Sequence, residues 1–169
     1  MFVGVEAGRF NPIIPFSKGA PLAEVDRETM HEKELIMSKT TPEQNKALVL
    51  EGFDTLFNKR DYSAAERFWS SNYIQHSAHI SPGREGLFNL VRSVPETMHY
   101  ENQLIVAEGD YVIAHGRFTG MGRPAAWIAA DILRFEDGIF AEHWDVLQDE
   151  ATQAASVSGL PMFGDCFPS

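Results

Sequence analysis

The chain has 169 residues, the usual length of one domain and enough to bury a single hydrophobic core without a disulfide or structural metal. Hydrophobic residues make up 44% of it and charged residues 22%, values that exclude a disordered or fibrous chain. The formal net charge of -10 repels phosphate backbones and anionic lipids, so we expect neither nucleic acid nor a membrane as a partner.

Cysteine content and hydropathy predict the compartment. Cys166 is the only cysteine, so the chain cannot form an internal disulfide. The first residues lack the basic start and apolar stretch of a signal peptide, and no apolar run approaches the ~20 residues that span a bilayer. We therefore expect a cytoplasmic protein.

Three segments are expected along the chain: an extended arm over residues 1–40, one domain over residues 41–163 and a tail over residues 164–169. Prolines and glycines interrupt every helical or strand period in the arm. Met37 stands just before a clear helix start, so translation could also begin there. The arm could lie across a neighbouring subunit or form a poorly ordered tail.

Helices are predicted first. Thr41-Pro42-Glu43-Gln44 is typical of a capping box with proline at the first helical position. A second, short helix is expected over Asp61–Ser70, and a third after Ser81-Pro82 that ends before Pro95. Apolar side chains recur at helical spacing and predict buried faces: Val49, Phe53, Leu56, Phe57, Ala65, Phe68, Trp69, Leu87, Leu90 and Val91.

From His99 onward the pattern changes to strands, separated by turns that contain glycine. The expected strands are Gln103–Glu108, Asp110–Thr119, Ala125–Phe135 and Ile139–Gln148. Helices followed by an antiparallel meander indicate an α+β fold, not the alternation of a parallel doubly wound sheet.

The segment from Asp131 to Asp145, DILRFEDGIFAEHWD, resembles the last two strands of SnoaL-like proteins in the NTF2-like superfamily, which follow a D-hydrophobe-x-R-x-x-x-G-x-I-x-E-H-W-D type of pattern. One departure is that Ile139 directly follows the turn glycine, with Phe140 after it. The run Tyr73-Ile74-Gln75-His76 is also similar, especially to the bacterial branch described as predicted aldol-condensation enzymes. The resemblance covers roughly residues 41–163.

The resemblance implies an NTF2-like cone, with three N-terminal helices packed on a curved antiparallel sheet that encloses a pocket. NTF2-like domains commonly dimerise through the outer sheet face, so the resemblance also leads us to expect a homodimer. In the polyketide cyclases of this family, an aspartate at the position matching Asp131 is the general base of an aldol ring closure. The same scaffold hosts isomerases, hydrolases, dehydratases and binding modules, so the fold alone does not fix the chemistry.

Turn chemistry gives a separate argument about Asp131. Glu136-Asp137-Gly138 suits a type I turn with a glycine bulge, which would place Phe135 opposite Ile139 and Asp131 opposite His143. A two-residue turn would instead pair Asp131 with Trp144. In either register the carboxylate lies among large rings.

An apolar pocket removes water from the carboxylate, which raises its pKa and makes it a base for a carbon acid beside a carbonyl. We expect Asp131 and His143 to be the catalytic pair, with His143 first among the donors for the enolate. The alternative is a satisfied buried pair that only orders the sheet. The other candidate pocket residues are Tyr73, His76, His79, His115, Trp127, Trp144 and Asp145.

No metal or cofactor is expected. His76 and His79 form an H-x-x-H pair, but zinc sites on helices use i, i+4 spacing and loop sites usually add cysteines. Phosphate loops, nucleotide fingerprints and nucleophile elbows do not appear in the sequence.

Three functions follow from these residues. The first is a cofactor-independent acid-base enzyme, an aldol-type cyclase, isomerase or lyase, acting on a small or polycyclic carbonyl compound. The second is a non-catalytic module that binds a hydrophobic small molecule in the same pocket. The third is a dimerisation domain whose pocket is filled by its own side chains.

Overall fold

The structure is a computed structural model that describes residues 39–168. The predicted arm of residues 1–40 therefore lies almost entirely outside the described residues, and so does Met37. In chain order, the elements are α2 (Pro42–Phe53), the π-helical turn η1 (Asp54–Asn58), α3 (Tyr62–Ala65), β1 (Trp69–Gln75), α4 (Gly83–Ser93), β2 (His99–Glu108), β3 (Tyr111–Thr119), β4 (Trp127–Glu136) and β5 (Ile139–Asp149).

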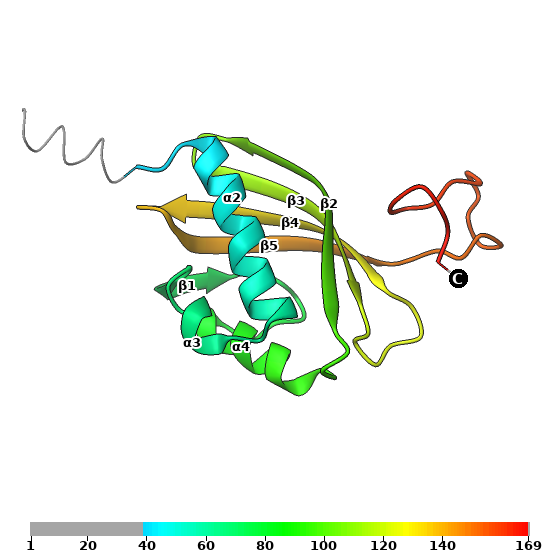
Figure 1. The fold of residues 1–169 in the computed structure, drawn as a ribbon, viewed down its shortest axis with the longest axis horizontal. Coiled ribbons are helices and arrows are strands. Elements are labelled where there is room, and N and C mark those ends of the chain that lie inside the picture. The colour runs from blue at the N-terminus through cyan, green and yellow to red at the C-terminus, as the bar shows by residue number, and fades with distance from the viewer. Residues whose placement is uncertain (1–38, 169) are drawn as a thin grey trace, which may run out of the picture. The chain divides into compact units, whose positions relative to one another are not determined.

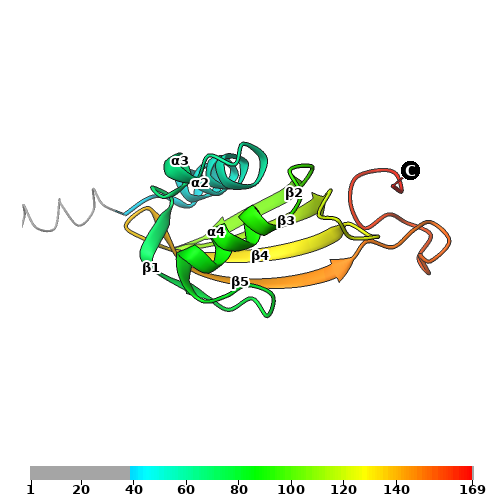
Figure 2. The same ribbon diagram turned by 90° about the horizontal axis from the view of Figure 1, so that it is seen from below.

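The five strands form one curved sheet in the order β1-β5-β4-β3-β2 (Figure 1). Strands β2 to β5 are a meander of antiparallel neighbours, whereas β1 pairs in parallel with β5 at the edge. The helices of the described residues lie on one side of the sheet (Figure 2). The α+β class predicted from the sequence is confirmed, and the sheet has one face under the helices and one outer face.

Helix α2 begins where its capping box predicts. The Thr41 hydroxyl accepts from the backbone amide of Gln44 at 3.2 Å, and the Gln44 side chain accepts from the Thr41 amide at 2.8 Å. Pro42 occupies the first turn, where its missing amide hydrogen costs nothing. The predicted apolar stripe is buried, because Val49 and Phe53 continue into Leu56 and Phe57 of η1.

The second predicted helix is wrong over its last part. Residues 62–65 are helical, but Trp69 already begins strand β1, which was not predicted. Its spacing of Trp69 and Tyr73 fits a helix as well as a strand. Pairing with β5 decides the outcome, because tertiary hydrogen bonds override weak local preference. A strand therefore stands between α3 and α4, and the predicted order of three helices before one meander is also wrong.

The core lies between the helices and the sheet face beneath them, and it is rich in aromatic rings. Trp69 of β1 meets Phe140 of β5 edge to face, with ring centroids 4.8 Å apart. Gly52 lets α2 approach these rings closely, since a Cβ there would lie 2.8 Å from the Phe140 ring. Close packing of this kind fixes how β1 and β5 present their remaining side chains to the same interior.

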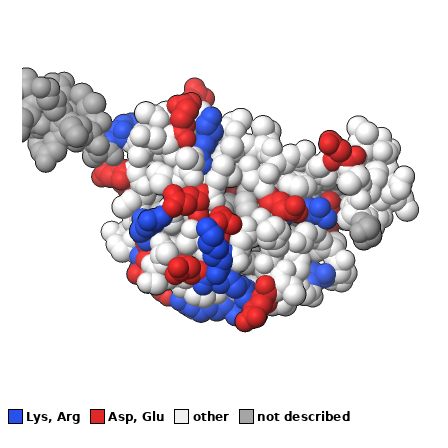
Figure 3. Space-filling view, viewed as in Figure 1, with Lys and Arg blue, Asp and Glu red and all other residues white. Residues whose placement is uncertain are grey.

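The surface over the helices carries intermingled acidic and basic side chains (Figure 3). Several form exposed ion pairs, such as Arg67 with Glu51 and Arg92 with Glu85. Pairs of this kind each contribute at most about 1 kcal/mol, because water screens them. Among residues 39–168, no helix has the length and apolar character needed to cross a bilayer.

Candidate active site

The β4–β5 hairpin sets the position of Asp131, and its register differs from both predicted registers. Asp137 and Gly138 have φ of 51° and 75°, so they form a two-residue turn that places Glu136 opposite Ile139. The register then shifts by one residue, since Phe135 faces Phe140 but Arg134 faces Glu142. Sequence reasoning favoured the glycine-bulge turn, gave the two-residue turn as the alternative and did not find the bulge in the strands.

Because of the bulge, Asp131 stands opposite Asp145, and His143 stands opposite Leu133. The predicted direct pairs of Asp131 with His143 or with Trp144 are therefore wrong. The prediction that Asp131, His143 and Asp145 share one face is nevertheless correct. The two-residue turn alone would shift the pairing by one residue from the favoured register, and the extra residue of the bulge shifts it by one more, so the same side chains of β5 face the helices. Asp131, His143 and Asp145 all point to the side of the sheet that the helices cover.

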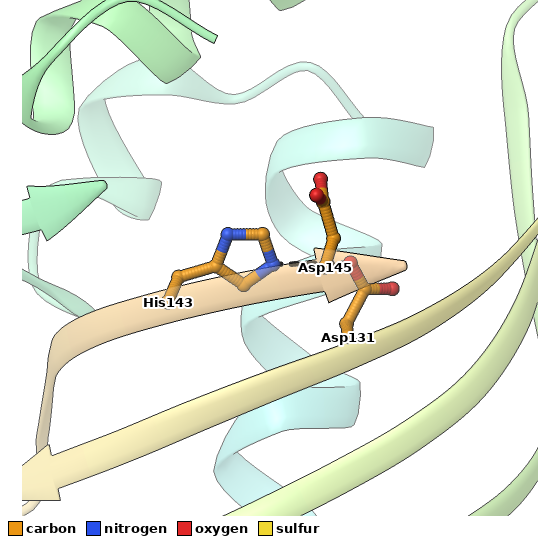
Figure 4. Close-up of side chains that lie close together, drawn as sticks. All are labelled: Asp131, His143 and Asp145. Carbon is orange, nitrogen blue, oxygen red and sulfur yellow. Dashed lines mark hydrogen bonds and ion pairs between the residues drawn. The ribbon is translucent and has the colours of Figure 1, made fainter. Parts of the chain in front are cut away.

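These three side chains lie close together (Figure 4). The His143 Nε2 atom is 3.1 Å from Asp131 Oδ1, a diagonal contact between neighbouring strands. One nitrogen or oxygen atom from each of the three side chains lies within 4.8 Å of the corresponding atoms of the other two. Asp131 and His143 are buried at 4% and 5% exposure, so their charges have little access to water. The second oxygen of Asp131, Oδ2, is buried and has no hydrogen-bond partner within the described range.

Strand β1 adds a residue that the sequence reasoning missed. Gln75 Oε1 lies 2.9 Å from His143 Nδ1, and the same oxygen accepts from the backbone amide of Ser77 at 2.9 Å. Gln75 is paired directly with His143 across the parallel strands. The sequence feature that could have revealed Gln75 is its position two residues after Tyr73. In a strand, residues two apart share one face, but the sequence reasoning did not predict a strand here.

A cavity of about 50 Å³ adjoins this cluster, enough for a few water molecules. Its polar lining comes from Tyr73, His79, Asp131, His143 and Asp145, and no lysine or arginine among residues 39–168 lines it. The remaining lining is apolar: Phe53, Phe57, Trp69, Ile80, Leu87, Leu90, Val91, Met98, Phe118, Met121, Trp127 and Leu147.

Burial determines how the cavity residues titrate. It raises the pKa of the Asp131 carboxyl above its usual value, and the hydrogen bond from His143 offsets only part of that rise. Burial also raises the pKa of the Tyr73 phenol, which keeps this hydroxyl protonated at neutral pH. The cavity thus combines a carboxyl group that resists ionisation with a phenol that can donate a hydrogen bond.

The predicted pocket residues separate into two groups. Tyr73, His79, Trp127 and Asp145 line the cavity together with the predicted pair. His79 and Trp127 face each other at its rim, with ring centroids 5.4 Å apart. The Trp127 indole nitrogen also donates to Asp149 at 3.0 Å, which holds this ring in place.

His76, His115 and Trp144 lie elsewhere, on the outer face of the sheet. His76 stacks on Trp144 with ring centroids 4.8 Å apart, and its Nε2 atom is 2.8 Å from Glu142 Oε1. The His115 ring faces Phe163 of the C-terminal segment at 5.9 Å. Strand alternation explains the separation, since His115 and Trp144 are each an odd number of positions from a cavity residue on their own strands, and His76 directly follows the last residue of β1.

The H-x-x-H pair does not converge on one point, because His76 is on the outer face and His79 is at the cavity rim. Among the described residues, the side chains close enough together to bind one metal ion are those of Asp131, His143 and Asp145. A hydrogen bond already joins two of its three members. The absence of a resident metal therefore stays a prediction.

Comparisons with known proteins agree with this geometry. A family profile described as a SnoaL-like domain matches residues 49–143. A ketosteroid isomerase candidate from Kribbella flavida has a similar structure, with a TM-score of 0.59 and 19% identity over 75% of this chain and 97% of that one. At this identity the likeness shows the fold alone, which this chain also shares with an NTF2-like protein from Cytophaga hutchinsonii (TM-score 0.54, 19% identity over 62% of this chain and 89% of that one).

Two further structures are similar at slightly higher identity. AclR, a hydroxylase candidate from Streptomyces galilaeus, has a TM-score of 0.53 and 26% identity over 64% of this chain and 91% of that one. A polyketide cyclase candidate from Bacillus cereus has a TM-score of 0.51 and 25% identity over 57% of this chain and 70% of that one. A search of curated proteins gives no match.

Proposed function

Because this chain belongs to the SnoaL-like family, we propose that it is a cofactor-independent acid-base enzyme, an aldol-type cyclase, isomerase or lyase, that acts on a carbonyl compound. The observation that carries the proposal is the Asp131 carboxyl group. It is buried beside an apolar cavity, is hydrogen-bonded to His143 through one oxygen and, among the described residues, has no partner for the other. A purely structural pair would satisfy both oxygens.

In the proposed reaction, Asp131 Oδ2 takes a proton from the carbon beside the substrate carbonyl. The electron pair of that C–H bond moves to the carbonyl oxygen and gives an enolate. The Tyr73 hydroxyl or the His143 ring donates a hydrogen bond to this oxygen. The enolate carbon then either attacks a second carbonyl, whose oxygen takes the proton back from Asp131 as the aldol bond closes, or the proton returns from Asp131 to another carbon of a conjugated enolate, which completes an isomerisation.

The lining of the cavity indicates the kind of substrate. Of the residues that the structure describes, no lysine or arginine lines it, whereas the acidic side chains of Asp131 and Asp145 do, so a neutral compound fits better than a carboxylate or phosphate. The volume of about 50 Å³ favours a small carbonyl compound. A polycyclic one would require the side chains at the rim to move.

The alternative function is non-catalytic binding of a hydrophobic small molecule. The observation that favours it is the mostly apolar lining, which would hold such a molecule without chemistry. The two functions differ in their need for Asp131, since an apolar ligand gains little from a carboxyl group. Tight binding that survives replacement of Asp131, with no chemical change of the ligand, would favour the alternative.

Homodimerisation through the outer sheet face is part of the proposal. Leu104, Val106, Ile113 and Val146 are exposed there, and strand pairing places them in two adjacent rows across the sheet. Contiguous exposed apolar side chains of this kind favour a protein interface. The cytoplasmic location, predicted from the single cysteine, also remains a proposal.

Incubation with a panel of small neutral ketones and aldehydes, followed by chromatography and mass spectrometry, tests the function. The wild-type protein should convert at least one compound, and Asp131→Asn should not. Glu142→Gln, which alters the carboxylate of the outer face, is the matched control and should keep activity. Conversion by Asp131→Asn at the wild-type rate would refute the role of Asp131.

A further inference from the structure

We propose that Gln75 is a positioning residue that fixes the hydrogen of His143 on Nδ1 and thereby confines one mobile proton between His143 Nε2 and Asp131 Oδ1. The inference deepens the proposed function, on which its role in turnover rests. Its geometric part concerns only Gln75, Ser77, His143 and Asp131. It can therefore be tested without a substrate.

The first step is the orientation of the Gln75 amide. The backbone amide of Ser77 can only donate, and it lies 2.9 Å from one end of the Gln75 side chain. That end must therefore be the oxygen, Oε1. The Gln75 nitrogen, Nε2, is buried without a partner in the part of the chain that the structure describes. An unpaired buried donor costs free energy, so the nitrogen does not explain why a glutamine stands here. The two hydrogen bonds of the oxygen are the favourable contacts that the Gln75 side chain makes at this site.

The second step is the tautomer of His143. Its Nδ1 atom is 2.9 Å from the same Gln75 oxygen, which can accept two hydrogen bonds but cannot donate. Nδ1 must then carry a hydrogen, since two facing lone pairs would repel. In the neutral ring the other nitrogen, Nε2, is consequently bare and can only accept.

The third step concerns Asp131. A bare Nε2 lies 3.1 Å from Asp131 Oδ1, so this contact is a hydrogen bond only if the carboxyl group is protonated on that oxygen. If the proton moves to Nε2, the pair becomes a carboxylate and an imidazolium. Both arrangements contain the same single proton and the same net charge. Burial of both side chains favours a pair whose total charge is zero.

A role in catalysis follows from this shared proton. Transfer of the proton from Oδ1 to Nε2 creates the carboxylate base inside the cavity without removing a proton to solvent. Oδ2 can then take the proton of the substrate, while the positive charge of the imidazolium, whose two N–H groups stay bonded to Gln75 and Asp131, stabilises the negative charge that develops on the enolate. Without Gln75, the ring could adopt the other tautomer and donate Nε2–H to a carboxylate, and the pair would hold one proton fewer.

Long-range proton–nitrogen correlation spectra of the ¹⁵N-labelled protein at neutral pH report the tautomer of each histidine ring. His143 is one of six histidines, and its signals are identified by their loss in His143→Gln. We expect Nδ1 of His143 to be protonated in the wild-type protein. In Gln75→Leu, the hydrogen should move to Nε2, because the acceptor facing Nδ1 is gone.

Two variants serve as controls. Gln75→Glu keeps an acceptor oxygen facing Nδ1 and should keep Nδ1 protonated. Ser77→Ala keeps the backbone amide that orients Gln75 and should leave the His143 signals unchanged. A wild-type ring protonated only on Nε2 would overturn the proposal, even if Gln75→Leu does not fold, and so would an unchanged tautomer in folded Gln75→Leu. Neither result depends on turnover, so failure of the proposed function is a separate outcome.

Discussion

The two faces of the sheet each carry a histidine–carboxylate pair, and the pairs are only one residue apart along β5. On the inner face, His143 lies 3.1 Å from Asp131, and both are buried. On the outer face, His76 lies 2.8 Å from Glu142, and the His76 side chain is 41% exposed. The same two chemical groups thus occur in two environments, which makes each pair a control for the other.

The surroundings of the carboxyl groups account for their opposite behaviour. Arg134 donates to Glu142 at 2.8 Å, and together with His76 it lowers the pKa of Glu142 below the usual range. Asp131 has no arginine or lysine in its cavity within the described part of the chain, and burial raises its pKa. A carboxylate held by a cation is a weak base, whereas one that resists ionisation in an apolar cavity is a better base.

The largest expected effect separates the two carboxyl groups. Asp131→Asn keeps the shape of the side chain but removes the base, and it should lower kcat by about 10²- to 10⁴-fold, the usual contribution of a general base. Glu142→Gln should leave kcat within about twofold, since the outer face does not touch the cavity. Steady-state kinetics on the compound found in the panel measure both. Equal losses in the two variants would remove the distinction between the faces.

The histidines should differ less than the carboxyl groups. His143→Gln removes the group that shares its proton with Asp131 and should lower kcat about 100-fold, while some activity persists because the carboxyl group remains. His76→Gln, on the outer face, should leave kcat unchanged. Both rates come from the same assay, with circular dichroism to verify folding. An inactive, folded His76→Gln would show that the outer pair contributes to turnover.

An interface should distinguish the outer face from the inner one. Val146 is 68% exposed at the β5 end of one of the two apolar rows, so Val146→Asp should weaken self-association about tenfold, equivalent to 1.4 kcal/mol, by placing a charge in the contact. Analytical ultracentrifugation over a concentration series measures the dissociation constant. Ser156→Asp, outside the strands, is the control. A wild-type protein that stays monomeric at high concentration would contradict the dimer.

Stability should change in opposite directions at the two carboxyl groups. The raised pKa of Asp131 means that its contribution to stability is fully present below its usual pKa of 3.8 and is lost as pH rises through the folded value. Asp131→Asn should therefore stabilise the protein at pH 7, by about 1 kcal/mol, as relief of strain at functional sites often does. The gain should disappear as pH falls toward 3.8.

Glu142 provides the matching measurement. Its lowered pKa means that its contribution is present above its usual pKa of 4.5 and is lost as pH falls through the folded value. Glu142→Gln should thus destabilise the protein at pH 7, by less than about 1 kcal/mol because the pair is near the surface. Urea unfolding at several pH values measures both variants. Stabilisation by Glu142→Gln would contradict the assigned environments.

Sequence reasoning predicted the features that local chemistry determines. The capping box at Thr41 gave the start of α2, and alternation along β4 and β5 put Asp131, His143 and Asp145 on one face. It did not give the strand register, because a bulge at the hairpin depends on how the sheet curves over its core. The alternation still held, since the extra residue compensated for the shorter turn.

Strand β1 shows why the rest of the site was missed. Trp69 and Tyr73 fit helical and strand spacing equally well, and only the parallel pairing with β5 settles the choice. Gln75 meets His143 through that pairing alone, between residues 68 positions apart. Local pattern therefore identified the catalytic candidates, whereas their supporting contact depends on the tertiary structure.

Solvent deuterium exchange tests the central role of Asp131 most directly. The protein is mixed in D₂O with a small cyclic ketone from the panel, and NMR follows the loss of hydrogen from the carbon beside the carbonyl. The wild-type protein and Glu142→Gln should both accelerate this exchange, and Asp131→Asn should reduce it to the rate without protein. Exchange by Asp131→Asn as fast as by the wild-type protein would contradict the account.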